Sequence, residues 1–157
     1  MRTVAEHGAP NSRWPAPTQD LGFEDVPAQP PPMLSGMHVE QIVDFVFALG
    51  DQVRYVAVAD GQDIQLRQRA GLPNASSNES DQFEELLVNP ALLLLTRQRG
   101  ELDCGGLHCV IVRYGNFTQV VVPNPTGGHV SIAVSANHDP FVIAEAVERL
   151  LGRGVAA

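Results

Sequence analysis

The sequence predicts an α/β (α+β) domain: one five-stranded antiparallel sheet with helices on both faces. Two observations predict this fold. Apolar residues recur with helical spacing in three segments and with strand spacing in five, in the order α-β-β-α-β-β-β-α. The strands within each group are joined by short turns, and short turns make neighbours antiparallel because parallel neighbours need a long crossover. Central strands that are apolar on both sets of alternating side chains require a covering layer on both faces.

Composition limits the kinds of partner. The chain of 157 residues is long enough for one domain with a hydrophobic core. Its formal net charge is −8, and all ten basic residues are arginine. This balance disfavours nucleic acid and anionic membranes, since phosphate surfaces attract clustered positive charge. No apolar run approaches the roughly 18 residues of a membrane-spanning helix, and the first residues lack the apolar stretch of a secretion signal. We therefore expect a cytoplasmic protein.

The N-terminal segment differs from the rest of the chain. Residues 1–36 hold seven of the twelve prolines and few periodic apolar residues. Such a segment cannot bury enough apolar surface to fold alone, so we predict a flexible arm, followed by a domain at 37–152 and a tail at 153–157. Docking of this arm onto the domain or onto a partner would use its large apolar side chains, among them Trp14, Leu21 and Phe23.

The first half of the domain is predicted as a helix and a hairpin. The helix covers 38–50 and stops at a glycine. A strand at 53–60, apolar on both faces, is followed by a tight turn and by a more exposed edge strand at 63–69.

The middle helix carries two apolar stripes. We expect Ser80 to cap its start and the Asn89-Pro90 pair to kink it or split it. One stripe is expected to cover the sheet and consists of Phe83, Leu86, Leu87 and Leu94. The other is expected to remain exposed and consists of Val88, Leu92 and Leu95. Exposed contiguous apolar surface usually marks an interface, which favours self-association. The alternative is that the first helix or the proline-rich arm covers this stripe.

The second half is predicted as a three-strand meander and a closing helix. The strands cover 107–114, 117–123 and 129–135, separated by turns rich in glycine and asparagine. The last helix covers 139–151, with Asp139 as its cap and a proline at its first position.

The stretch Asp103-Cys-Gly-Gly-Leu-His-Cys109 holds both cysteines. Two thiolates and an imidazole are good zinc ligands, but a closed structural site needs four ligands, and Cys-x4-Cys is not the usual knuckle spacing. On a strand, His108 and Cys109 would point to opposite faces, which disfavours a nucleophile–base pair. We therefore predict a glycine turn that enters a strand, with no metal site. A metal protein or enzyme built on Cys104, His108 and Cys109 stays as the less favoured alternative.

Other candidate motifs are weaker. The loop at 123–129 has glycines but lacks the phosphate-loop pattern and its lysine, and it joins two strands. His129 and His138, at the ends of the last strand, are expected to be exposed, and Asp60 and Asp63 are expected to stabilise a turn. No acid–base pair, catalytic triad or cofactor fingerprint is found, so neither catalysis nor a cofactor is expected.

Three stretches carry a resemblance to a known family. The hairpin VRYVAVADGQDI, the meander RYGNFTQVVVPNPTGGHVSIAVS and the closing helix DPFVIAEAVERLL together resemble the roadblock/dynein light chain family over residues 38–151. The resemblance implies a homodimer in which two sheets join edge to edge and the middle helices pack together. It also implies a non-catalytic scaffold or regulator of NTPases, notably small Ras-like GTPases.

The resemblance assigns positions to the expected interface. The strand at 107–114 would form the dimer edge, and Val88, Leu92 and Leu95 would lie at or near the helix pairing. The interface residues expected on the edge strand are Cys109, Ile111 and Arg113. The alternative function is a sensor of profilin-like or PAS-like type with a small molecule between sheet and helix, where Ala57, Ala59 and Ala133 could leave a cavity.

Overall fold

The computed structural model describes residues 38–153. The predicted arm at 1–36 lies outside the described residues, as does the tail beyond Arg153. The elements in chain order are α1 (Val39–Ala48), β1 (Val53–Asp60), β2 (Asp63–Gln68), α2 (Asn78–Phe83), the π-helical turn η1 (Glu84–Val88), α3 (Asn89–Asp103), β3 (Val110–Arg113), β4 (Phe117–Pro123), β5 (His129–Ser135) and α4 (Pro140–Leu150).

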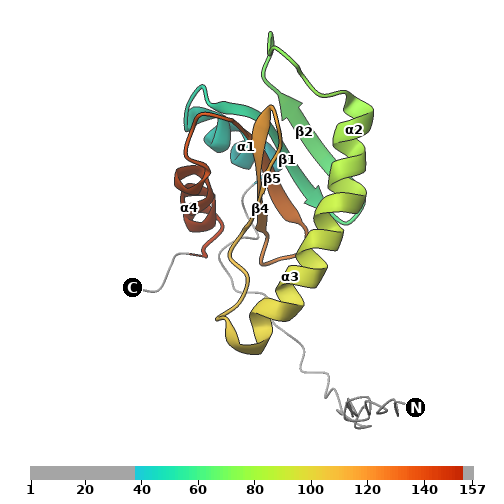
Figure 1. Cartoon of the computed structure of the whole chain (residues 1–157), viewed down its shortest axis with the longest axis vertical. Helices are drawn as coiled ribbons and strands as arrows, with labels where there is room; N and C mark the ends of the chain where they lie inside the picture. Colours follow the sequence, from blue (N-terminus) through green and yellow to red (C-terminus); the bar gives the residue numbers. More distant parts are fainter. Residues whose placement is uncertain (1–37, 154–157) are drawn as a thin grey trace, which may run out of the picture.

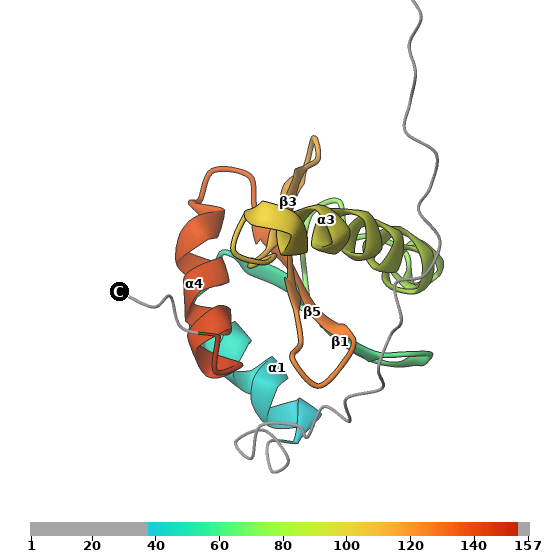
Figure 2. The same cartoon turned by 90° about the horizontal axis from the view of Figure 1, so that it is seen from below.

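The five strands form one antiparallel sheet in the order β2-β1-β5-β4-β3. Figures 1 and 2 show α1 and α4 on one face of this sheet and the continuous rod of α2, η1 and α3 across the other. The predicted three-layer sandwich with an antiparallel sheet is therefore confirmed. We call α2, η1 and α3 together the middle helix.

The hydrophobic core lies between the sheet and the pair α1 and α4. Alternate side chains of β1, β4 and β5 point to this face, and both helices place one apolar stripe against them. The most deeply buried members of this core are Val46, Val53, Val56, Val120, Val122, Val130, Ile132, Val134, Ile143, Val147 and Leu151. Asp139 caps α4 as predicted, because its carboxylate accepts a hydrogen bond from the Phe141 N–H at 2.9 Å.

The middle helix begins and bends differently from the prediction. Ser77, not Ser80, is the N-cap, and its hydroxyl accepts a hydrogen bond from the Ser80 N–H at 3.2 Å. The helix does not break at Asn89-Pro90. Instead, the Asn89 N–H donates to the Glu84 carbonyl five residues earlier, which makes a π-helical turn directly before the proline. Proline lacks an N–H, so one wider turn at this point lets the helix continue.

The assignment of the two apolar stripes was wrong. The stripe expected to cover the sheet is exposed, with Phe83 and Leu87 at 58% and Leu94 at 60% exposure. Val88 and Leu92, expected to remain exposed, are half-buried towards the sheet. Two causes explain this difference. The side chains that face the sheet include polar ones, and the wider π turn rotates the later part of the helix relative to the earlier part.

The turn between β4 and β5 packs tightly on the end of β1. Gly128 has a φ of +68°, and a Cβ atom there would lie 1.8 Å from the Ala59 carbonyl oxygen. Gly61, in the β1–β2 turn, has a similar φ of +62° but has open space around the same position. Both turns therefore need a residue that tolerates positive φ, and Gly128 also needs the absence of a side chain.

These two glycines make a matched pair for a stability test. We expect Gly61→Ala to lower the free energy of unfolding by about 1 kcal/mol through backbone strain alone. Gly128→Ala adds a clash with backbone and should cost about 3 kcal/mol or more. Urea unfolding of both variants measures the difference. Equal costs at the two positions would contradict the close approach.

Candidate functional site

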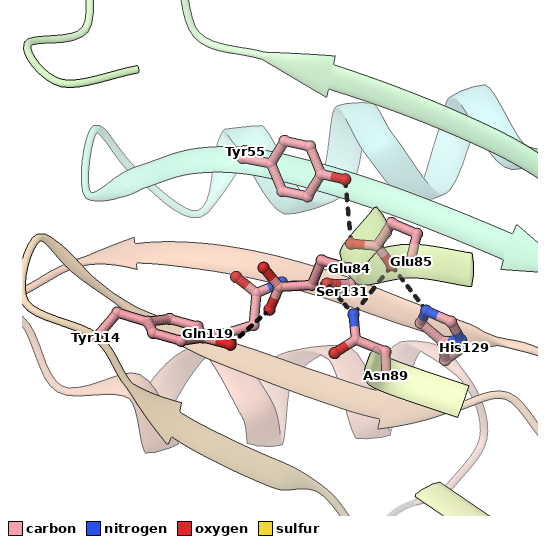
Figure 3. Close-up of polar contacts among 8 residues, drawn as sticks. All are labelled: Tyr55, Glu84, Glu85, Asn89, Tyr114, Gln119, His129 and Ser131. Atoms are coloured by element: carbon pink, nitrogen blue, oxygen red, sulfur yellow. Dashed lines mark hydrogen bonds and ion pairs between the residues drawn. The ribbon is translucent and has the colours of Figure 1, made fainter. Parts of the chain in front are cut away.

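A buried carboxylate joins the middle helix to the sheet. Glu85, only 1% exposed, sits at the η1 turn and points down onto the sheet. Its Oε1 accepts the Tyr55 hydroxyl at 3.0 Å, and its Oε2 accepts the Asn89 Nδ2 group at 3.1 Å. The His129 Nε2 atom lies 2.7 Å from Oε2 and donates to it, because a carboxylate is only an acceptor. Figure 3 shows these contacts, which come from β1, β5 and the helix itself.

A second set of polar side chains extends this network towards β4. Asn89 Nδ2 also donates to the Ser131 hydroxyl at 3.2 Å, and Gln119 Nε2 donates to the same oxygen (Figure 3). All three side chains are buried. The Asn89 Oδ1 atom is buried without a hydrogen-bond partner among the described residues. We call Tyr55, Glu85, Asn89, Gln119, His129 and Ser131 the buried polar network.

A separate half-buried pair lies beside the edge of the sheet. The Tyr114 hydroxyl donates to Glu84 Oε1 at 3.1 Å (Figure 3). Burial raises the pKa of Glu84, and the hydrogen bond from Tyr114 opposes that shift. Burial, reinforced by the charge of Glu85, raises the pKa of Tyr55 far above its ordinary value, so this hydroxyl remains a donor. The network therefore holds the helix on the sheet by directed polar contacts, in addition to the buried side chain of Leu93.

The outer face of the middle helix is strongly apolar. Five large side chains on it are between 41% and 66% exposed, namely Phe83, Leu86, Leu87, Leu94 and Leu95. Soluble monomers rarely expose contiguous apolar surface of this kind unless it is an interaction site. The buried polar network thus holds a helix whose sheet side is partly polar and whose solvent side is apolar.

The two flanks of α3 differ in what they face. Leu94 and Arg97 line a groove against the β1–β2 turn and the start of β5. With 3.6 residues per turn, Leu92 and Leu95 fall on the other flank of α3, and α3 also contacts β3. Leu95 is 66% exposed there. Of the predicted helix interface residues, Leu95 is therefore exposed, whereas Val88 and Leu92 are half-buried.

The predicted edge strand is shorter than expected. β3 begins at Val110 and pairs only with β4 among the described strands, so its other side is an edge of the sheet. Cys109 and Ile111 are half-buried and pack against the core on the α4 side. Arg113 is exposed, and its guanidinium donates to the Thr118 hydroxyl at 3.5 Å. The free edge of β3 thus consists mainly of backbone, between half-buried apolar side chains.

His108 and Cys109 do not alternate on a strand as predicted, because both residues precede β3. The His108 Nδ1 atom lies 3.2 Å from Glu148 Oε2, and the Cys109 thiol lies near the same carboxylate. Burial raises the pKa of Cys109, and Glu148 adds to that shift, so the thiol is a poor nucleophile. Among residues 38–153, no group of three His, Cys, Asp or Glu side chains is placed to hold a metal ion.

The two strand-end histidines also differ from expectation. His138 is exposed, but His129 is buried at 3% exposure within the network. The expected alternative was a ligand between sheet and helix. The cavity beside Tyr55 and Gln119 measures about 20 Å³, room for about one water molecule. A larger groove of about 390 Å³, open to solvent, lies beside Ala59 and Leu93. In residues 38–153, no helix is long and apolar enough to span a membrane.

The buried polar network was not predicted from the sequence. Glu85 and Asn89 stand four residues apart within an apolar stretch, and Gln119 and Ser131 interrupt two apolar strands. The sequence signal for such a network is polar residues at helical or strand spacing inside elements that are otherwise buried, since buried polar groups need hydrogen-bond partners. The partners themselves depend on the register of β4 and β5, where Gln119 and Ser131 lie on adjacent strands.

Comparisons with family models and with curated proteins found no match. Solved structures share the arrangement. A crystal structure of a roadblock/LC7 domain from Streptomyces avermitilis covers 74% of this chain and 93% of its own, with 12% identity and a TM-score of 0.57. The gliding protein MglB from Thermus thermophilus covers 73% and 91%, with 12% identity and a TM-score of 0.51. A structure of MglB with a tetrameric arrangement covers 72% and 89%, with 13% identity and a TM-score of 0.50.

At these identities the likeness shows the fold. Residues 38–153 form a roadblock-like domain, which confirms the resemblance drawn from the hairpin, the meander and the closing helix. Fold alone does not assign an activity, so function must be argued from the surfaces described above.

Removal of the central carboxylate should destabilise the protein strongly. Glu85→Ala leaves the Tyr55 hydroxyl, the Asn89 amide and the His129 ring buried without their shared acceptor, at an expected cost of about 3–5 kcal/mol. Chemical unfolding monitored by circular dichroism measures this cost. The control Glu101→Ala, an exposed carboxylate of α3, should change stability by no more than about 0.5 kcal/mol. A Glu85→Ala variant as stable as the control would contradict the role of the network.

Proposed function

We propose that this chain is a non-catalytic, homodimeric regulator or scaffold that binds a small Ras-like GTPase or another signalling NTPase in the cytoplasm. The observation that carries the proposal is the apolar outer face of the middle helix beside the free edge strand β3, on a roadblock-like domain. An exposed apolar helix face favours association with another protein, and a free strand edge can form backbone hydrogen bonds with a strand of another chain.

The two sheet edges are not equally suited to pairing. β2 is protected by charge: the Arg67 guanidinium lies 2.6 Å from Asp44 Oδ1 and 4.8 Å from the centre of the Phe47 ring. Charged side chains of this kind discourage edge-to-edge association. β3, with the sequence VIVR, carries three half-buried apolar side chains and one arginine. The proposal therefore places the homodimer contact at β3.

The flank of α3 that faces β3 supports the same placement. Leu95 projects there from the exposed face, and Leu92 is half-buried. Two copies joined at β3 would bring these flanks together across the dimer axis, so a symmetric contact would bury the same leucines from both chains. The outer helix surface of both copies, with Phe83 and Leu87, would then form one apolar platform for a partner.

The identity of the partner rests on the family resemblance. Two of the solved structures with this fold are of MglB, one described as a gliding protein and the other as a tetrameric arrangement. The roadblock family as a whole is associated with regulation of small GTPases, and no cluster of metal-ligating side chains lies among residues 38–153. We therefore propose that the platform receives a GTPase and that this chain acts on it through binding.

The dimer contact is tested by two neighbouring leucines with similar exposure. Leu95, at 66%, lies on the β3 flank, whereas Leu94, at 60%, lies on the groove flank. We expect the full chain to be a dimer at micromolar concentration by sedimentation analysis. Leu95→Asp should shift it to the monomer, because two carboxylates would meet at the dimer axis, while Leu94→Asp should remain dimeric. A wild-type monomer would contradict the dimer, and equal effects of both variants would contradict its placement on the β3 flank.

The partner is tested by capture from native lysate. The tagged full chain is incubated with lysate containing added GTP or GDP, and bound proteins are identified by mass spectrometry. We expect enrichment of a small GTPase in one nucleotide state, with loss of that enrichment in the Phe83→Asp variant, which changes the platform but not the dimer flank. Capture that does not depend on the nucleotide or on Phe83 would contradict the proposal.

A further inference from the structure

A groove on the far flank of α3 is not used by the proposed dimer. It has a volume of about 390 Å³ and lies between α3 and the turns at the β1–β2 and β4–β5 ends. Its apolar lining comes from Leu86, Pro90, Leu93 and Leu94, and Arg97 lies in the same lining. We call it the α3 groove. Because β1 and β5 lie on the opposite side of α3 from β3, edge-to-edge pairing at β3 leaves this groove open.

We propose that the α3 groove is a docking site for this chain's own N-terminal arm, and that the segment Asp20–Asp25 occupies it. The proposal goes beyond the proposed function. The groove shares Leu86 and Leu94 with the apolar outer face of the middle helix, but the dimer contact at Leu95 and the partner platform at Phe83 and Leu87 lie outside its lining.

The start of the described chain lies at the same end of the sheet as the groove. Val39, the first residue of α1, lines a small cavity together with Ala59, Asp60 and Thr126. Ala59 also lines the α3 groove, so the end of β1 separates the two spaces. The N-terminal arm therefore joins the domain close to the groove. The segment from Phe23 to His38 can span up to roughly 50 Å when extended. This length is far greater than the spacing of about 5 Å between neighbouring strands, so the segment can reach around the end of β1 to the groove.

The chemistry of the segment matches that of the groove. Its sequence, Asp-Leu-Gly-Phe-Glu-Asp, combines two large apolar side chains with three carboxylates. Leu21 and Phe23 are two residues apart, so in an extended backbone they share a face. The groove offers leucines and a proline to such a face.

The charges are also complementary. Arg97 is exposed and forms no salt bridge with any residue of the described range 38–153. Glu24 and Asp25 follow Phe23 directly, so a docked segment brings two carboxylates towards this guanidinium. Carboxylate pairing with arginine adds direction to an otherwise apolar contact. The exposure of Leu94 at 60% is then accounted for by a cover from the same chain.

Site-directed photocrosslinking of the full chain tests this proposal. The variant Phe23→benzoylphenylalanine is irradiated, and the crosslinked peptide is mapped by mass spectrometry. We expect adducts within residues 86–97 or on the turns near Gly61 and Gly128. An equal mixture of ¹⁴N- and ¹⁵N-labelled chains should give adducts of a single label, because the contact is within one chain. Adducts spread over the domain without preference, or adducts only between chains, would overturn the proposal.

Two matched variants separate this result from the dimer. In the Leu94→Asp background, the yield of the groove adduct should fall by about fivefold or more, the change expected from loss of a strong interface contact. Leu95→Asp should leave this yield unchanged even if the protein becomes monomeric. Arg97→Glu should also weaken the adduct, and the compensating changes Glu24→Arg and Asp25→Arg should restore it. An adduct that is insensitive to Leu94 and Arg97 would overturn the assignment to the groove.

Discussion

The structure depends on one buried carboxylate. Glu85 accepts hydrogen bonds from a tyrosine of β1, a histidine of β5 and an asparagine of its own helix. A buried charge is tolerated only when its hydrogen-bonding capacity is met, and here three donors meet it. Since the sheet face under the middle helix offers small apolar groups such as Ala57 and Ala133, directed polar contacts fix the helix where apolar packing is thin. The orientation of the helix, and hence which side faces solvent, follows from these contacts.

That orientation explains the unusual distribution of leucines. With a partly polar side turned to the sheet, the apolar side of the helix is left on the outside, and its two flanks face different neighbours. One flank adjoins the free edge of β3, and the other forms the wall of the α3 groove. In the two proposals above, one side of this helix serves self-association and the other side holds the N-terminal arm. The π-helical turn at Glu84–Val88 contributes, because it places Glu85 and Asn89 together over the sheet while Pro90 follows without a break.

Much of the fold could be predicted from the sequence, for identifiable reasons. Three predicted features are confirmed because each has a local physical cause. They are the strand that is apolar on both faces, the helix that begins with Asp139 before Pro140, and the short turn around Gly61. The faces of the middle helix could not be predicted in this way, because hydrophobic periodicity assumes that the apolar side is buried and that the helix has a constant period. Glu85 and the π turn violate both assumptions. His129 was expected to be exposed for a similar reason: its burial depends on Glu85, 44 residues earlier in the chain.

The most direct test of the proposed dimer is hydrogen exchange at β3 in the full chain, measured by NMR at increasing protein concentration. In this dimer, β3 is an edge within one chain and becomes an interior strand of a continuous sheet when two chains meet. The N–H groups of Val110–Arg113 that point away from β4 should therefore exchange rapidly in dilute solution and become protected as the dimer forms. Rapid exchange of these groups at every concentration, in a protein that associates, would show that the copies meet elsewhere and would contradict a dimer joined at β3.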